Sequence, residues 1–361
     1  MDTLRLAIDP AQLESSAARG ALALAAALVR AGELVALPTE TVYGLGANAL
    51  DPAAVVRIFK AKQRPAWDPV IVHIAGPASV DNPMLRQLVT AAPESARRLI
   101  EAFWPGPLTL LLPRSAAVPD VVTAGRPLVG IRMPAHPVAL RLIENAGIPI
   151  AAPSANVFAH ISPTSADHVL ADLSGRIAAV LDAGPTRHGV ESTVLDPMQS
   201  PMIVYRPGAV TLEQIRLAAG PVELFHTDQP LAETPPEALP SPGVGLRHYA
   251  PRARLVLVNA PVAKLAEEIV KSAASFTSER LGLLLPTELQ TDARLATLGS
   301  TVFAWGHWSN PDELAQRLYA GLRALDDAGC TTVICPLPPA EGVGVAVSDR
   351  LRKAAWKLIS V

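Results

Sequence analysis

The apolar residues of the chain alternate between helical and strand-like spacing over most of its length. Residues 11–30 are rich in Ala and Leu and end before Gly32, which predicts a helix, and the apolar run at 34–37 predicts a strand. A second helix is predicted from Pro52 to Lys60, because Asp51 suits the N-cap. Further strands are predicted at 70–74, 108–112, 129–133, 148–151, 178–182, 192–196 and 203–206, with helices at 94–102, 137–145 and 165–170.

The alternation resumes after a proline-rich interruption. Thr211 and Gln214 predict a capping box for a helix that ends before Gly220. Residues 221–251 are rich in proline and show no apolar periodicity, which predicts a linker. Beyond it, strands are predicted at 254–258, 281–285, 301–304 and 331–336, with helices between them that include one from 311 to 328. We therefore predict an α/β chain with domains at 1–220 and 252–361, joined by the linker at 221–251.

Composition narrows the class of protein. The 361 residues are 50% hydrophobic and 18% charged, which excludes a disordered or collagen-like chain. The 31 Lys and Arg nearly balance the 33 Asp and Glu, so any anionic ligand must bind to a local cluster of charge. Cys330 and Cys335 lack a second cysteine pair or a nearby histidine pair, which favours reduced thiols. With no signal peptide or apolar run of about 20 residues near the N-terminus, we expect a cytoplasmic protein.

Two motifs near residues 44–65 carry candidate phosphate chemistry. Gly44-Leu-Gly46-Ala-Asn-Ala49 fits the dinucleotide pattern GxGxxA, but no acidic residue follows the next strand, so a tight turn is favoured. Lys62 and Arg64 lie at a helix end beside Pro65. They either complement the helix dipole or, if the chain is extended there, bind a polyphosphate.

Two later motifs combine short polar side chains with the end or start of a strand. Ser154 and Asn156 follow a predicted strand end, where open α/β sheets place ligands, and Ser162 opens the next helix. Taken alone these are also ordinary turn residues. Ser192 lies at the start of a strand, and His73, within an apolar run, would by itself be a core histidine.

Five motifs occur in order along the chain: Pro38-Thr-Glu-Thr-Val-Tyr-Gly-Leu-Gly46, Lys62-x-Arg-Pro65, Val70-Ile-Val-His73, Trp104-Pro-Gly-Pro-Leu-Thr109 and Ser154-x-Asn156. Together they resemble the YrdC-like domain of threonylcarbamoyl-AMP synthases, and the resemblance covers residues 13–207. Ser241-Pro-Gly243 and Arg247-His-Tyr-Ala-Pro251 resemble the longer form of this enzyme, which has a linker and a C-terminal domain.

The resemblance implies an open, twisted mixed-sheet catalytic domain, a linker that acts as a lid, and a smaller C-terminal parallel, Rossmann-like α/β domain. The implied activity is that of a nucleotidyltransferase, which condenses L-threonine with bicarbonate or CO2 and ATP to give threonylcarbamoyl-AMP and pyrophosphate. Its product serves the threonylcarbamoyl modification of the adenosine next to the anticodon in tRNA. ATP is then a substrate, and Mg2+, tRNA and a downstream threonylcarbamoyl transferase complex are expected, with no membrane.

The resemblance also implies the site residues. The expected catalytic residues are Lys62, Arg64, Ser154 and Asn156, which also contact ATP together with Asp68, Ser162, Arg206 and Tyr249. L-threonine is expected to contact Thr41, His73, Arg132, Ala152 and Ser192, with Arg132 pairing its carboxylate.

The chain departs from the family pattern at two positions. Asp68 stands where the family usually has Asn, so a carboxylate lies beside the expected phosphate site and would bind Mg2+ or cap a helix. Leu128 stands where the family often has a Thr that contacts ATP, so that contact is not expected here. Neither departure removes a reacting group.

Three alternative functions stay open at the level of sequence. Carbamoyl-adenylate-forming enzymes of hydrogenase maturation share the YrdC-like unit, but they add paired-Cys zinc motifs. A non-catalytic module would bind structured RNA through a cationic face, with strong salt dependence. A dinucleotide-dependent oxidoreductase rests on Gly44, Gly46 and Ala49 alone.

Overall fold

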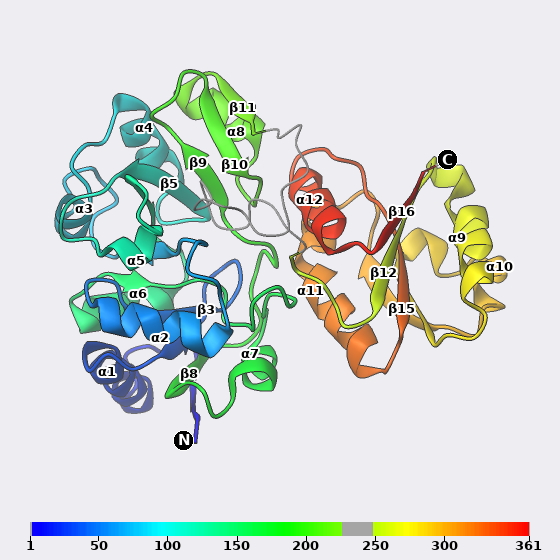
Figure 1. Ribbon diagram of the computed structural model, residues 1–361, viewed down its shortest axis with the longest axis horizontal. Coiled ribbons are helices and arrows are strands. Elements are labelled where there is room, and N and C mark those ends of the chain that lie inside the picture. Colours follow the sequence, from blue (N-terminus) through cyan, green and yellow to red (C-terminus); the bar gives the residue numbers. More distant parts are fainter. Residues whose placement is uncertain (1, 226–247, 361) are drawn as a thin grey trace. The chain divides into compact units, whose positions relative to one another are not determined.

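The computed structural model describes residues 2–225 and 248–360, which divide into two compact units (Figure 1). Unit 1 comprises Met1–Phe158, Ser162–Arg187 and Glu191–Leu246, and unit 2 comprises Ala159–Ile161, His188–Val190 and Arg247–Val361. Most of the predicted linker at 221–251, including Ser241-Pro-Gly243 and Arg247, lies outside the described residues. The domain boundaries at 220 and 252 and the lid therefore stay predictions.

Unit 1 is built on a mixed sheet. Within the described residues it has eleven strands in the order β1-β8-β2-β3-β7-β4-β6-β5-β9-β10-β11. The strands are β1 (Leu4–Ala7), β2 (Val35–Leu37), β3 (Gly44–Asn48), β4 (Ile71–His73), β5 (Leu108–Pro113), β6 (Leu128–Arg132), β7 (Ile150–Ala151), β8 (Ala179–Asp182), β9 (Thr193–Asp196), β10 (Met202–Arg206) and β11 (Val222–Leu224). The helices are α1 (Ser16–Arg30), α2 (Pro52–Lys62), α3 (Pro83–Leu88), α4 (Glu94–Phe103), α5 (Asp120–Thr123), α6 (Pro137–Ala146), α7 (Ala166–Leu173) and α8 (Leu212–Ala219).

The glycine-rich motif forms strand β3, so both the predicted tight turn and the dinucleotide fingerprint are wrong. The fingerprint requires its glycines in a turn between a strand and a helix, whereas Gly44 and Gly46 lie within the sheet. A Cβ on Gly46 would lie 2.8 Å from Leu37 Cδ2 and 3.0 Å from Ile150 Cγ2. These glycines therefore serve close packing within the sheet.

Strand alternation separates the core of unit 1 from a polar face. Val72, Leu110 and Ile131 belong to the main hydrophobic core, which also takes in residues of α2, α4, α7 and α8. Successive strand residues point to opposite faces, so the register places their neighbours His73, Thr109 and Arg132 on the other face. Over that face, α1 and α6 pack in a separate cluster with Val35, Leu37 and Leu181 of β2 and β8. Near β4, β5 and β9 the apolar residues of this face form only a small cluster of Ile71, Leu111 and Val194, with Leu128 and Tyr205 against it.

Unit 2 is a parallel α/β unit, as predicted. Its described strands lie in the order β14-β13-β15-β12-β16, and every pairing between them is parallel. The strands are β12 (Arg254–Asn259), β13 (Leu281–Pro286), β14 (Thr301–Gly306), β15 (Thr332–Pro336) and β16 (Lys357–Ser360). The helices are α9 (Leu265–Ala273), α10 (Ala293–Ala296), α11 (Pro311–Asp327) and α12 (Gly344–Ala354), with short 3-10 turns at Val262–Lys264, Ala274–Phe276 and Thr287–Leu289.

Figure 1 shows helices packed against the sheet of each unit. None of the helices within residues 2–225 and 248–360 has the length and apolar content that crossing a membrane requires.

Candidate active site

Lys62 lies at the end of α2, where the chain leaves the helix. Gln63 adopts a left-handed conformation with φ 53°, and α2 ends before Arg64 and Pro65. The Lys62 side chain is only 1% exposed, and its Nζ donates to the backbone oxygens of Ser154 and, at 2.6 Å, of Asn156. Burial, reinforced by the nearby Arg64 charge, lowers the pKa of Lys62 well below its usual value. A buried amine held by the backbone of Ser154-x-Asn156 is not the exposed cation that complements a helix dipole.

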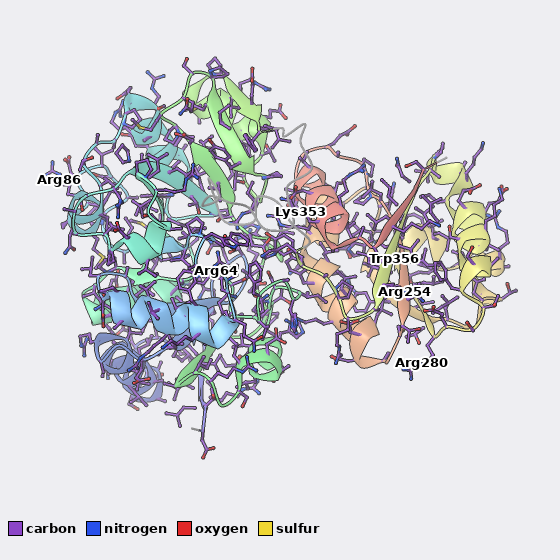
Figure 2. The ribbon with its side chains drawn as sticks, viewed as in Figure 1. Arg64, Arg86, Arg254, Arg280, Lys353 and Trp356 are labelled. Atoms are coloured by element: carbon purple, nitrogen blue, oxygen red, sulfur yellow. The ribbon has the colours of Figure 1, made fainter. Side chains whose placement is uncertain are left out.

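Arg64 is held by the turn that follows it. Its Nη2 lies 2.9 Å from Asp68 Oδ2 and donates to the Pro69 carbonyl oxygen at 2.7 Å, and its Nε donates to the Asp68 carbonyl oxygen at 3.1 Å. Figure 2 shows Arg64 within unit 1, whereas Arg86 points outward from α3. Arg64 thus lies in the same buried region as Lys62, whose pKa its charge lowers.

Asp68 is a buried carboxylate surrounded by cations. The expectation that it caps a helix is wrong, because the next helix, α3, is capped by Asn82. Burial raises its pKa, against the opposing effects of Arg64, Lys62 and Arg206. Its Oδ1 has no hydrogen-bond partner within the described part of the chain. Asp68 therefore keeps one oxygen unused while the other pairs with Arg64.

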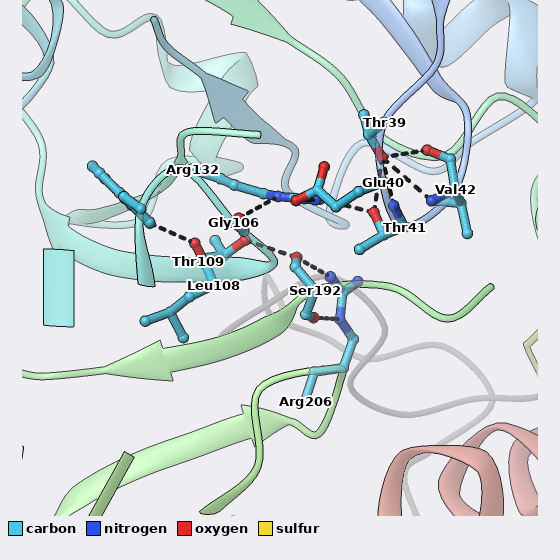
Figure 3. Close-up of polar contacts among 11 residues, drawn as sticks. Thr39, Glu40, Thr41, Val42, Gly106, Leu108, Thr109, Arg132, Ser192 and Arg206 are labelled. Carbon is cyan, nitrogen blue, oxygen red and sulfur yellow. Dashed lines mark hydrogen bonds and ion pairs between the residues drawn. The ribbon is translucent and has the colours of Figure 1, made fainter. Parts of the chain in front are cut away.

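Arg132 anchors a second polar group, which lies on the polar face of the sheet (Figure 3). It ends β6 and pairs in register with His73, which ends the parallel strand β4. Arg132 Nη1 donates to Thr41 Oγ1 at 3.0 Å, Nε donates to the Gly106 carbonyl oxygen at 3.2 Å, and Nη2 lies 2.7 Å from Glu40 Oε1. The guanidinium is thus fixed in one orientation by two separate segments of the chain, one at Glu40 and Thr41 and the other at Gly106.

The groups around Arg132 have perturbed ionisation. Burial alone would raise the pKa of Glu40, but the charge and hydrogen bond of Arg132 lower it, so Glu40 is a carboxylate at neutral pH. Burial, with the Arg132 charge, lowers the pKa of His73 from 6.5 to about 3. His73 is therefore neutral, and Glu40 and Arg132 form a buried ion pair beside it.

Ser192 lies between Arg206 and Thr109 at the start of β9. Arg206 Nη2 donates to Ser192 Oγ at 3.2 Å and its Nε donates to the Ser192 carbonyl oxygen at 3.1 Å. Ser192 Oγ also shares a 2.8 Å hydrogen bond with Thr109 Oγ1 of β5. Ser162 donates to Glu191 Oε1 at 2.6 Å, next to Ser192 in the chain. A predicted ATP contact, Arg206, and a predicted threonine contact, Ser192, are thus direct neighbours.

The remaining predicted residues have clear positions. The backbone N–H of Ala152 donates to the Ile71 carbonyl oxygen at 2.8 Å, beside β4. Leu128 begins β6, half-buried beside the small apolar cluster. Tyr249 belongs to unit 2, where it is 2% exposed, stacks on Tyr319 with ring centroids 5.9 Å apart, and has the Arg350 guanidinium 5.0 Å from its ring centroid. Its role in ATP binding stays a prediction.

Three polar residues of this region had no predicted role: Glu40, Thr109 and Glu191. All are at most 6% exposed, and each bonds directly to a predicted site residue. Each also lies inside or next to a motif that is recognisable from the sequence. A carboxylate or hydroxyl within such a motif is therefore the sequence signal that could have identified these three residues. In the described residues, no group of three or more His, Cys, Asp or Glu side chains could hold a metal ion.

Comparison with known proteins identifies the family. Residues 27–208 match the family described as "Telomere recombination", and residues 210–356 match the family described as "Threonylcarbamoyl-AMP synthase, C-terminal domain". The threonylcarbamoyl-AMP synthase of Pyrococcus abyssi is 42% identical, over 94% of this chain and 95% of its own length. That of Bacillus subtilis is 44% identical over 92% of both chains.

A solved structure extends this likeness to the fold. The crystal structure of P. abyssi Sua5 complexed with L-threonine has a TM-score of 0.87 and 40% identity to this chain, with 100% of each chain covered. The expected mixed-sheet domain followed by a parallel α/β domain is thereby confirmed, as is the expected family. The chain belongs to the threonylcarbamoyl-AMP synthase family, whose members are enzymes that use ATP as a substrate.

Proposed function

We propose that the chain synthesises L-threonylcarbamoyl-AMP from L-threonine, bicarbonate or CO2, and ATP, with release of pyrophosphate. The observation that carries this proposal is a buried cluster of basic side chains. Lys62, Arg64, Arg132 and Arg206 are all at most 8% exposed. Arg64 and Arg132 have carboxylate partners, whereas no ion pair joins Lys62 or Arg206 to a carboxylate among the described residues. Such buried basic groups are suited to binding a polyanion and a carboxylate.

Lys62, Arg64, Ser154 and Asn156 form the proposed nucleotide side of the site, with Ser162, Arg206 and Tyr249 as further contacts. In the reaction, a carbamate oxygen forms a bond to the α-phosphorus of ATP while the bond from that phosphorus to the leaving pyrophosphate breaks. Charge builds on the phosphate oxygens in this step, so fixed cations are the main contribution of the protein. The side-chain nitrogens of Lys62 and Arg64 are held in place by hydrogen bonds to backbone carbonyl oxygens. Such fixed positions suit groups that stabilise the charge of a transition state.

The threonine side of the proposed site comprises Thr41, His73, Arg132, Ala152 and Ser192. Arg132 is already oriented by Thr41 and Glu40, and we propose that its guanidinium binds the substrate carboxylate. The neutral His73 beside it adds no second charge. A carbamate loses CO2 readily, so burial of these groups favours the product by excluding water.

The residues present also fit a magnesium ion that arrives with the nucleotide. Mg2+ in nucleotide sites is usually bound by one or two carboxylates together with phosphate oxygens. Asp68 is the residue that would hold it, because its Oδ1 is buried and has no hydrogen-bond partner within the described residues. The ion would neutralise phosphate charge.

We further propose the cellular setting that this product implies. Threonylcarbamoyl-AMP would be passed to a threonylcarbamoyl transferase complex that modifies the adenosine next to the anticodon of tRNA. The free, buried thiols of Cys330 and Cys335 are consistent with a reducing compartment, which supports the cytoplasm.

The test is release of AMP and pyrophosphate from ATP and Mg2+, with L-threonine and bicarbonate omitted in turn, followed by mass spectrometry of the adenylate. We expect release to require both co-substrates and to fall at least about a hundredfold in Lys62→Ala, because one removed transition-state donor costs about that much. Lys60→Ala is the matched control, since Lys60 lies two residues earlier on the same helix and is exposed. It should retain wild-type turnover.

Two outcomes would contradict the proposal. Adenylate formation that depends on carbamoyl phosphate and ignores L-threonine would instead indicate a carbamoyl-adenylate-forming enzyme. Salt-sensitive RNA binding without any AMP release would indicate a binding module.

A further inference from the structure

The hydroxyls of Thr109 and Ser192 form a buried pair with one more proton than the described residues accept. Arg206 is only a donor, and its Nη2 donates to Ser192 Oγ at 3.2 Å. The 2.8 Å bond between Ser192 Oγ and Thr109 Oγ1 uses one of the two hydroxyl protons. The other proton has no acceptor among the described residues, although Thr109 is fully buried and Ser192 is 1% exposed. A buried donor without an acceptor is costly, so this pair calls for a ligand oxygen.

The direction of the shared hydrogen bond decides which hydroxyl keeps the spare proton. Thr109 lies within β5, and its Cγ2 packs closely over Gly130 of the neighbouring strand. A Cβ on Gly130 would lie only 3.3 Å from this methyl group. The Thr109 hydroxyl has Ser192 Oγ as its hydrogen-bond partner in the described part of the chain. Ser192 lies before β9 and also accepts from a cation. If Thr109 donates to Ser192, both Thr109 and Arg206 are satisfied, and the spare proton lies on Ser192.

We propose that Thr109 is a positioning residue that makes the Ser192 hydroxyl a fixed hydrogen-bond donor to an anionic oxygen of L-threonine or its carbamate. This proposal rests on the proposed threonine site. Ser192 Oγ accepts hydrogen bonds from Thr109 and Arg206, so the direction in which its own O–H can donate is restricted. Acceptance from a guanidinium also polarises its O–H bond and strengthens its donation to a carboxylate.

The test compares two substitutions of Thr109 in the full chain. Thr109→Val keeps the shape but removes the donor, and we expect it to raise the KM for L-threonine about tenfold while the KM for ATP changes less than about twofold. Thr109→Ser keeps the donor and should restore the KM for L-threonine. Thr332→Val is the matched control, because Thr332 is a fully buried strand threonine of unit 2 that donates to Glu279. It should leave both KM values unchanged.

A double-mutant cycle separates the hydrogen bond from simple packing. In a Ser192→Ala background, Thr109→Val should raise the KM for L-threonine no further, since its partner is already gone. If Thr109→Val does not fold, Thr109→Ala replaces it with the same expectation, and L-threonine binding is measured by calorimetry. Equal impairment in Thr109→Val and Thr109→Ser, or a wild-type KM in Thr109→Val, would overturn the proposal. If the unmodified chain releases no AMP in response to L-threonine, the proposed function itself fails instead.

Discussion

His73 shows how a single residue of the proposed site affects stability. The fold lowers its pKa from 6.5 to about 3, so the folded state holds it neutral while the unfolded chain binds a proton between these pH values. Protonation therefore favours unfolding, and stability is lost as the pH falls below about 6.5. Between pH 7 and pH 5 this residue should cost about 2 kcal/mol of unfolding free energy.

Urea unfolding of wild type and His73→Asn at pH 7 and pH 5 measures this effect. The wild type should lose about 2 kcal/mol more than the variant over that interval. His307→Asn, which removes a histidine that is 60% exposed, is the control and should follow the wild type. Equal pH dependence in wild type and His73→Asn would show that His73 is not held neutral by the fold.

Some individual residues of the proposed site could be predicted from the sequence, and others could not. Short motifs predicted Lys62 with Arg64 and Ser154 with Asn156 as site residues, because the members of each pair lie two residues apart in the chain. The hydrogen bond between Thr109 and Ser192 could not be predicted, because the two residues are 83 positions apart and only the pairing of β5 with β9 brings them together. The ion pair of Glu40 with Arg132 likewise depends on a long-range arrangement.

At the scale of elements, apolar runs predicted most of the buried strands, whereas the exposed edge strand β1 and the glycine-rich strand β3 were not predicted. β1 is mostly exposed and lies at the edge of its sheet, so it lacks the apolar periodicity that predicts a strand. For β3 the sequence predicted a tight turn, because Gly44 and Gly46 are typical turn residues and no acidic residue follows the next strand. The reason for glycine at position 46 is its packing against Leu37 and Ile150, which sequence periodicity does not record.

Gly46→Ala and Gly20→Ala test this explanation as a matched pair. A Cβ at Gly46 would contact Leu37 and Ile150 at 3.0 Å or less, so the substitution should destabilise the chain by about 1–3 kcal/mol. A Cβ at Gly20, inside α1, meets nothing within 4 Å, and alanine there should stabilise by about 0.5–1 kcal/mol. Urea unfolding would measure both, and a neutral Gly46→Ala would contradict the packing argument.

At the scale of the whole molecule, the sequence could predict the α/β class. It could not predict the strand order or which segments of the chain make up each unit. Strand order joins segments far apart in sequence, such as β1 with β8 and β5 with β9. Two stretches of only three residues, Ala159–Ile161 and His188–Val190, belong to unit 2 although unit 1 flanks them. Three residues are too few to show any periodicity, so no sequence pattern could assign them.

Because the proposed threonine residues all lie in unit 1, binding of L-threonine should stabilise that unit selectively. Some amide hydrogens exchange only when the unit opens and releases its ligand. When the ligand is present at 100 times its dissociation constant, the exchange of these hydrogens slows about a hundredfold. Hydrogen exchange should therefore slow in β4, β6 and β9 and stay unchanged in β12, β13 and β15. Arg132→Met should abolish the slowing, because it removes the proposed carboxylate partner. New protection in the strands of unit 2 alone would show that the threonine site had been placed in the wrong unit.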